Sequence, residues 1–174
     1  MNYIGSKNGH YYFRDKDSNI YEISTLSEKV HFCCNNNNDT HDFEDEMYSI
    51  KNEVDTIDKF DLVLLRVQYI NKNEKVRFRY VGTMHGNKYF LDNFYNVYGY
   101  SKAKPNEVHF CGLRRNKDTK VDDLKERGLL EFKCKMPSVT SLDLKNAEEV
   151  RGPRKSTKAK APRQPKTARN SKKG

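Results

Sequence analysis

The chain of 174 residues contains one sequence pattern twice, and this internal repeat constrains the fold more than any other feature. Residues 3–33 match residues 80–111 with nine identities at an offset of 77 and, after one inserted residue, four more at an offset of 78. Each copy begins with Tyr-x-Gly, continues with a Tyr-Phe pair and ends in Val-His-Phe-Cys. Chance is a poor explanation for identities in this order, so we expect two copies of one supersecondary unit.

The distribution of apolar residues predicts an α+β fold of antiparallel strands and short helices. Residues 60–69 and 75–81 are typical of an antiparallel hairpin around Asn71-Lys-Asn73, because apolar residues predominate in the first and alternate with cations in the second. Three short helices and one more strand complete the prediction, at residues 92–100, 120–127 and 141–150 and at residues 129–133.

The composition divides the chain into four segments. Residues 39–58 hold eight acids against one Lys, which is typical of a solvated connection between the repeats. We therefore expect a truncated first repeat (1–48), an acidic linker (49–59), a fuller second domain (60–150) and a disordered basic tail (151–174).

The net charge of +9 is confined to the tail. Ten of the 33 Lys and Arg residues lie in 151–174, which has no acid, so residues 1–150 keep 23 bases against 24 acids. A segment without large apolar residues cannot offset the entropy of ordering, but its cations release counterions when they neutralise phosphates. The alternatives are a solubilising tail or a nuclear localisation signal. The expected nucleic-acid contacts of the tail are Arg151, Arg154, Lys155, Lys158, Lys160, Arg163, Lys166, Arg169, Lys172 and Lys173.

A second basic group lies in the predicted domain. Lys75, Arg77 and Arg79 alternate along the expected strand, so they share one face and match the direction of a phosphate backbone. Arg114 and Arg115 are expected to extend this surface. The alternative is an ordinary solvated strand face, which alternation produces by default.

The His-Phe-Cys end of each repeat raises the question of zinc. His31 and Cys33 point the same way on a strand, as do His109 and Cys111, and two such pairs supply the ligand types of a tetrahedral site. The usual CxxC or HxxxH spacing is missing, and a duplicated buried strand explains the pattern equally well. We therefore expect no metal and no other cofactor.

Catalytic and targeting signals are absent from the sequence. It has no P-loop, no GxSxG and no HExxH motif, so we expect no enzyme. No apolar run reaches the roughly 20 residues of a membrane span, no signal peptide is visible, and the four cysteines form no CxxC pair. These features favour an intracellular protein that is not secreted and has no membrane partner.

Six short motifs follow one another in the second repeat. They are Phe78-Arg-Tyr-Val81, Lys88-Tyr-Phe90, Tyr98-Gly-Tyr100 at the end of the expected short helix, Glu126-Arg-Gly-Leu-Leu130, Lys135-Met-Pro137 and Glu148-Glu-Val150. In their order and spacing they resemble the N-terminal domain of the baculovirus repeated open reading frame (Bro) proteins, which also occurs in phage antirepressors. The resemblance covers about residues 75–150, and the first repeat matches only the front of the domain. It implies an α+β domain in a DNA-binding or transcription-modulating protein of a large DNA virus.

Together these features predict a non-enzymatic protein that binds DNA or RNA, with DNA favoured, in viral transcription, replication or packaging. We expect it in the host nucleus, or otherwise in the cytoplasm, with nucleosomes or a viral protein as further candidate partners. The alternative is a protein-interaction module that binds a host or viral regulator and uses the tail as a nuclear localisation signal.

Overall fold

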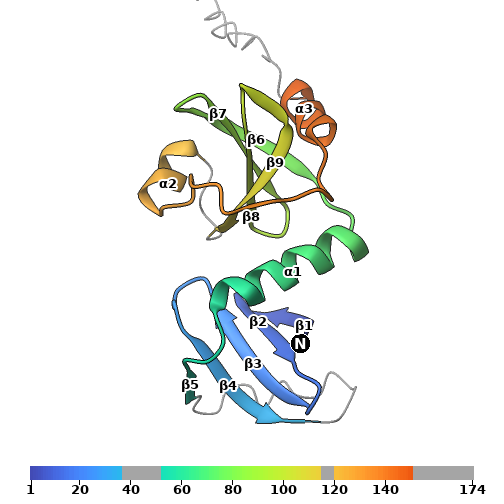
Figure 1. Ribbon diagram of the computed structural model, residues 1–174, viewed down its shortest axis with the longest axis vertical. Coiled ribbons are helices and arrows are strands. Elements are labelled where there is room, and N and C mark those ends of the chain that lie inside the picture. Colours follow the sequence, from blue (N-terminus) through green and yellow to red (C-terminus); the bar gives the residue numbers. More distant parts are fainter. Residues whose placement is uncertain (37–51, 115–119, 151–174) are drawn as a thin grey trace, which may run out of the picture.

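The computed structural model describes residues 1–36, 52–114 and 120–150, and it has an α+β fold. Two five-stranded antiparallel sheets lie on either side of one long helix, α1 (Figure 1). The first sheet has its strands in chain order: β1 (Asn2–Lys7), β2 (His10–Arg14), β3 (Asn19–Ser24), β4 (Val30–Asn35) and β5 (Asn52–Val54).

The second sheet repeats this order and is covered on both faces. Helix α2 (Val121–Glu126) packs on the outer face and α3 (Ser141–Val150) on the inner face, whereas α1 (Lys59–Asn73) lies between the two sheets (Figure 1). Its strands are β6 (Phe78–Met84), β7 (Asn87–Asp92), β8 (Asn96–Ser101), β9 (Lys104–Leu113) and β10 (Cys134–Lys135).

Helix α1 corrects the predicted hairpin. Asp58 caps it, because its Oδ1 atom accepts a hydrogen bond from Phe60 N at 2.8 Å. Its buried residues are Leu62, Val63, Arg66, Val67 and Ile70, a spacing that places them along one side of a helix. Residues 60–69 are therefore helical rather than the first strand of a hairpin.

One apolar cluster joins the two sheets through α1. Phe13 and Ile23 from the first sheet, Val67 from α1, and Phe90 and Phe110 from the second are all 0% exposed and belong to this cluster. The predicted segments 1–48 and 60–150 thus share a core. Three residues of the predicted linker, 52–54, form β5 at the edge of the first sheet.

The two sheets have corresponding irregularities. A register shift separates Tyr3 from Gly5 in the β1–β2 pair and Tyr80 from Gly82 in the β6–β7 pair. Asp15 and Asp92 occupy corresponding turns. In each, Oδ1 accepts hydrogen bonds from the backbone N–H groups two and four residues later, and Oδ2 accepts them from an Asn and a Tyr side chain.

Two other predicted elements are wrong and two are confirmed. Residues 92–100 are not a helix, because the Asp92 carboxylate holds residues 92–96 in a turn and β8 follows. Residues 129–133 form no strand, and the short β10 comes after them. The helices predicted at 120–127 and 141–150 correspond to α2 and α3.

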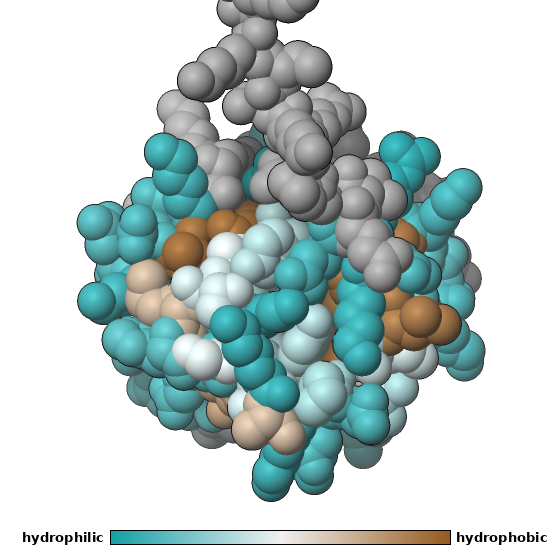
Figure 2. Space-filling view, turned by 90° about the horizontal axis from the view of Figure 1, so that it is seen from above, coloured by the Kyte–Doolittle hydropathy of each residue, from teal (hydrophilic) through white to brown (hydrophobic). Residues whose placement is uncertain are grey.

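The surface seen in Figure 2, from the end that carries the second sheet, is mostly hydrophilic, with small separate hydrophobic patches. Among the described residues, no helix combines the length and the apolar character that a membrane span requires.

Candidate nucleic-acid interface

The predicted basic residues lie at one edge of the second sheet. Lys75 and Arg77 are in the extended segment that leads from α1 into β6, and Arg79 is in β6, the edge strand. Phe78 and Tyr80 turn inward, where their rings pack 5.5 Å from Tyr98 and 5.4 Å from Phe90. Because side chains alternate along a strand, Arg79 lies on the opposite, outer face.

The turn at residues 92–96 brings Arg77 and Arg114 to the same end of the sheet. Arg77 N donates to Asn93 Oδ1 at 2.7 Å, and Asn93 N donates to Arg77 O at 3.2 Å. At the other side of the turn, Arg114 N donates to Tyr95 O at 2.7 Å. Residues far apart in the chain thus flank one turn, with Arg79 two positions beyond Arg77.

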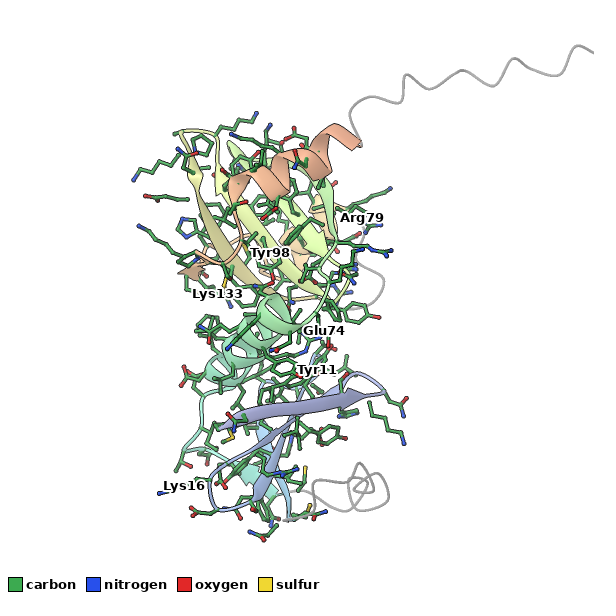
Figure 3. The ribbon with its side chains drawn as sticks, turned by 90° about the vertical axis from the view of Figure 1, so that its right-hand side faces the viewer. Tyr11, Lys16, Glu74, Arg79, Tyr98 and Lys133 are labelled. Atoms are coloured by element: carbon green, nitrogen blue, oxygen red, sulfur yellow. The ribbon has the colours of Figure 1, made fainter. Side chains whose placement is uncertain are left out.

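The charges of the strand are available to an external anion. Within the described part of the chain, the side chains of Lys75, Arg77 and Arg79 form no ion pair. On the same sheet, by contrast, Lys88 binds Glu148 at 2.8 Å. Figure 3 places Arg79 at the side of the second sheet, away from the core. We call Lys75, Arg77, Arg79 and Arg114 the basic edge.

One aromatic residue beside the basic edge, Tyr95, was not predicted from the sequence. The guanidinium carbon of Arg114 lies 5.4 Å from the centre of the half-buried Tyr95 ring. The exposed Tyr69 on α1 packs instead against the first sheet, where its ring centre lies 5.3 Å from that of Tyr3. The internal repeat could have indicated Tyr95, because an aromatic residue stands there in the second copy where the first copy has Ser18.

The remaining predicted contacts lie outside the described residues. Arg115 and the whole tail, 151–174, belong to this group. The basic edge is therefore the part of the predicted interface that has a described geometry.

The predicted zinc ligands do not meet. Cys33 packs with Tyr12 and Ile20 on the outer face of the first sheet, whereas Cys111 packs with Leu124 on the outer face of the second. The two cysteines therefore belong to separate apolar clusters, with α1 and the shared cluster between the sheets. Among the described residues, no three His, Cys, Asp or Glu side chains are grouped as metal ligands.

The two thiols are buried in separate apolar clusters. Burial raises the pKa of Cys33 to about 12, and burial likewise raises the pKa of Cys111 to about 12. Both side chains therefore resemble small apolar core residues at neutral pH. All four cysteines are free thiols.

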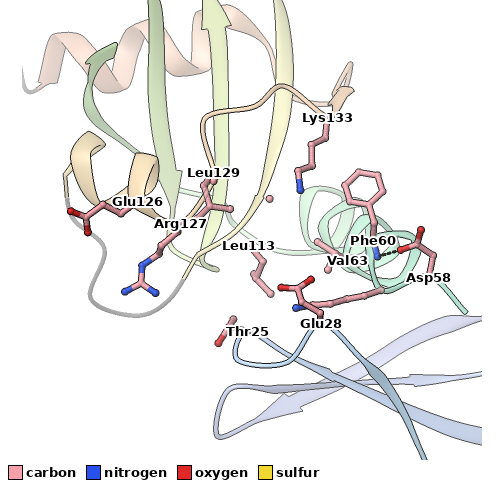
Figure 4. A pocket seen from close by; sticks show the side chains of 13 residues that line it. Thr25, Glu28, Asp58, Phe60, Val63, Leu113, Glu126, Arg127, Leu129 and Lys133 are labelled. Atoms are coloured by element: carbon pink, nitrogen blue, oxygen red, sulfur yellow. Dashed lines mark hydrogen bonds between the residues drawn. The ribbon is translucent and has the colours of Figure 1, made fainter. Parts of the chain in front are cut away.

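A cleft of about 530 Å³ opens between the two sheets at the first turn of α1 (Figure 4). Its apolar wall includes Phe60, and the Lys133 amine lies 5.8 Å from the centre of that ring. Burial lowers the pKa of Lys59, whose Nζ donates to Ser27 O at 2.7 Å. The charged lining residues balance, so the cleft offers a polyanion no net attraction; they are Lys59, Arg127 and Lys133 against Glu28, Asp58 and Glu126.

Comparisons of the chain with protein-family models, with curated proteins and with solved structures find no match.

Proposed function

We propose that this protein binds nucleic acid without chemistry of its own, through phosphate contacts from the basic edge and from the tail. The observation that carries the proposal is the arrangement of Arg77, Arg79 and Arg114 around one turn, with the half-buried Tyr95 ring beside Arg114. Cations in a row along a strand attract a phosphate backbone, and each contact releases counterions. The tail adds ten positive charges to the same chain.

We also propose that the two sheets are copies of one unit, of which only the second carries the basic edge. The equal strand order, the matching register shifts and the matching Asp15 and Asp92 turns support this proposal. Arg79 corresponds to Asn2. Arg114, which donates to Tyr95 O, corresponds to Asn36, which donates to Ser18 O. Since the first sheet uses Asn at both places, the fold does not require the arginines.

The resemblance to the Bro N-terminal domain adds an expectation about where the protein acts and on which nucleic acid. A protein of this kind would act on viral DNA in the host nucleus. The helix that the resemblance implies at Tyr98-Gly-Tyr100 is strand β8, so the resemblance rests on the remaining motifs. The proposed nucleic-acid contacts stand on the basic edge and do not depend on it.

The test is the affinity for DNA as a function of salt concentration. The double variant Arg77→Ala/Arg79→Asn removes two charges from the basic edge. Its matched control, Lys102→Ala/Lys104→Ala, removes two charges from exposed positions at the opposite end of the same sheet. We expect the first pair to weaken binding and to reduce the salt slope by about 1.5 to 2, and the control to change both much less.

A chain that ends at residue 150 separates the tail from the folded part. If that chain retains affinity that depends on Arg77 and Arg79, the basic edge binds by itself. If the full chain fails to bind DNA or RNA at about 50 mM salt, where phosphate contacts are strong, the proposal is wrong. The protein-interaction alternative then takes its place.

A further inference from the structure

Tyr95 has a backbone conformation that its side chain disfavours. Its φ angle is +70°, in the left-handed region that Gly and Asn occupy far more readily than an aromatic residue. The Asp92 carboxylate sets this turn through the N–H groups of Phe94 and Asn96, so the Tyr95 side chain is not what makes the turn.

The first sheet contains the same turn without an aromatic residue. Ser18 has a φ angle of +65°, and the Asp15 carboxylate holds the N–H groups of Asp17 and Asn19. The fold therefore requires a positive φ at this position but not a tyrosine. Strain of this kind concentrates at functional sites, which makes the ring of Tyr95 a candidate for function.

The Tyr95 ring lies beside the arginines of the basic edge, where a base of a bound strand would be close to its phosphates. The guanidinium carbon of Arg114 lies 5.4 Å from the centre of the half-buried ring, and the backbone N–H of Arg77 donates to Asn93 in the same turn. An aromatic ring flanked by cations that match a phosphate backbone is the arrangement by which proteins bind unpaired bases.

We propose that Tyr95 stacks on a nucleobase, and that the ligand of the basic edge is therefore single-stranded nucleic acid. This inference rests on the function proposed above. In a duplex the faces of the bases are covered by their neighbours, so a tyrosine ring at the surface reaches them only in an unpaired strand. The stacking chemistry is common to DNA and RNA.

The test compares four labelled ligands with the full chain: an oligo-dT and an oligo-rU of about 20 nucleotides, an abasic strand of equal charge, and a duplex. We expect both base-containing strands to bind about tenfold more tightly than the abasic strand, which offers phosphates alone. A preference between dT and rU would identify the natural strand. Equal affinity for base-containing and abasic strands would overturn the inference and leave the phosphate contacts intact.

Variants at residue 95 separate stacking from packing. Tyr95→Asn keeps a residue that tolerates the positive φ, so we expect an unfolding midpoint close to that of the wild type. Its affinity for the base-containing strands should fall to that for the abasic strand. Tyr95→Phe keeps the ring and should bind like the wild type. Ser18→Asn, the matched control in the first sheet, should change no affinity.

Two results for Tyr95→Asn would overturn the inference. If Tyr95→Asn binds the base-containing strands like the wild type, Tyr95 is not a stacking residue. If it lowers the unfolding midpoint strongly and weakens all strands alike, the ring serves packing, and the inference is overturned. If no strand binds the wild type, the failure is that of the proposed function.

Discussion

The guanidinium carbon of Arg66 lies 4.0 Å from the centre of the Tyr11 ring. The same side chain donates to Phe94 O at 2.9 Å and to Asn96 Oδ1 at 3.3 Å. Tyr11 belongs to the first sheet, and the other two partners belong to the second. A cation on α1, only 3% exposed, therefore binds both sheets and holds the turn that carries Tyr95.

Replacing this residue should destabilise the whole protein. Arg66→Ala removes two hydrogen bonds and a desolvated cation–π contact, so we expect the free energy of unfolding to fall by about 3 kcal/mol. Urea denaturation measures the loss. Gln68→Ala, an exposed change on the same helix, is the control and should have little effect. Equal effects of the two substitutions would show that Arg66 does not join the sheets.

The position of Arg66 also explains why α1 was mistaken for a strand. A surface helix shows one apolar stripe, but α1 lies between two sheets and packs on two sides. Leu64 and Leu65 contact the core in addition to Leu62 and Val63, so four apolar residues follow one another and the exposed Asp61 and Gln68 leave only a narrow polar stripe. An apolar run of this kind does not distinguish a buried helix from a strand except by length.

The turn and β8 were mistaken for a helix for a related reason. Phe94, Val97 and Tyr98 have helical spacing. In the structure Val97 packs on the outer face of the second sheet and Tyr98 on the inner face, and both faces are covered. A strand that is buried on both sides lacks the alternation by which a sequence reveals it.

The basic edge was predicted in part. The alternation of Arg77, Phe78 and Arg79 is a local property, and the sequence was sufficient for it. The approach of Arg114 to the same turn depends on four strands pairing in register, which local patterns do not encode. The repeat could have supplied Tyr95, because an aromatic residue replaces Ser18 inside an otherwise equal turn.

The two corresponding aspartates should give stability opposite dependences on pH. Burial raises the pKa of Asp92, although hydrogen bonds from Asn96, Phe94 and Tyr98 limit the increase. The folded state then binds the proton more tightly than the unfolded state, so the contribution of Asp92 is lost as pH rises from about 4 through its folded pKa. The difference in unfolding free energy between the wild type and Asp92→Asn should shrink over this range.

Asp15 provides the matched comparison. Desolvation, the largest single effect, raises the pKa of the half-buried Asp15 carboxyl, but hydrogen bonds from Asn19, Asp17 and Tyr21 together outweigh it, and the net shift is downward. Its contribution is present above about pH 4 and is lost as pH falls through its folded pKa. The difference between the wild type and Asp15→Asn should therefore grow as pH rises. Parallel pH profiles for the two variants would contradict the assigned directions.

The cysteines should react with a maleimide in a defined order. Cys111 is 0% exposed, and with a pKa of about 12 its thiolate is only about one part in 10⁵ at pH 7. Cys34 is half-buried and should be labelled first, with Cys111 at least about 100-fold slower. Mass spectrometry of peptides after timed labelling measures the order, and labelling in urea is the control. Reaction of Cys111 as fast as Cys34 would place it at the surface.

Gly99 in β8 should not tolerate even a methyl group. A Cβ atom there would lie 2.7 Å from Phe132 Cε1 and 3.1 Å from the backbone O atom of Lys88. The first sheet has Glu22, which is 4% exposed, at the corresponding position, so the strand itself accommodates a side chain there. We expect Gly99→Ala to lower the free energy of unfolding by about 1 to 3 kcal/mol, as overpacking does.

A double-mutant cycle identifies the cause of that loss. Phe132→Ala removes the nearest of three obstacles, so Gly99→Ala should cost less in the Phe132→Ala background than in the wild type. The remaining cost reflects the contacts with the backbone O atom of Lys88 and with Tyr89 Cδ1, each at 3.1 Å. Additive effects of the two substitutions in urea denaturation would show that Phe132 does not pack over Gly99. The outer face of the second sheet would then be covered differently from the arrangement described above.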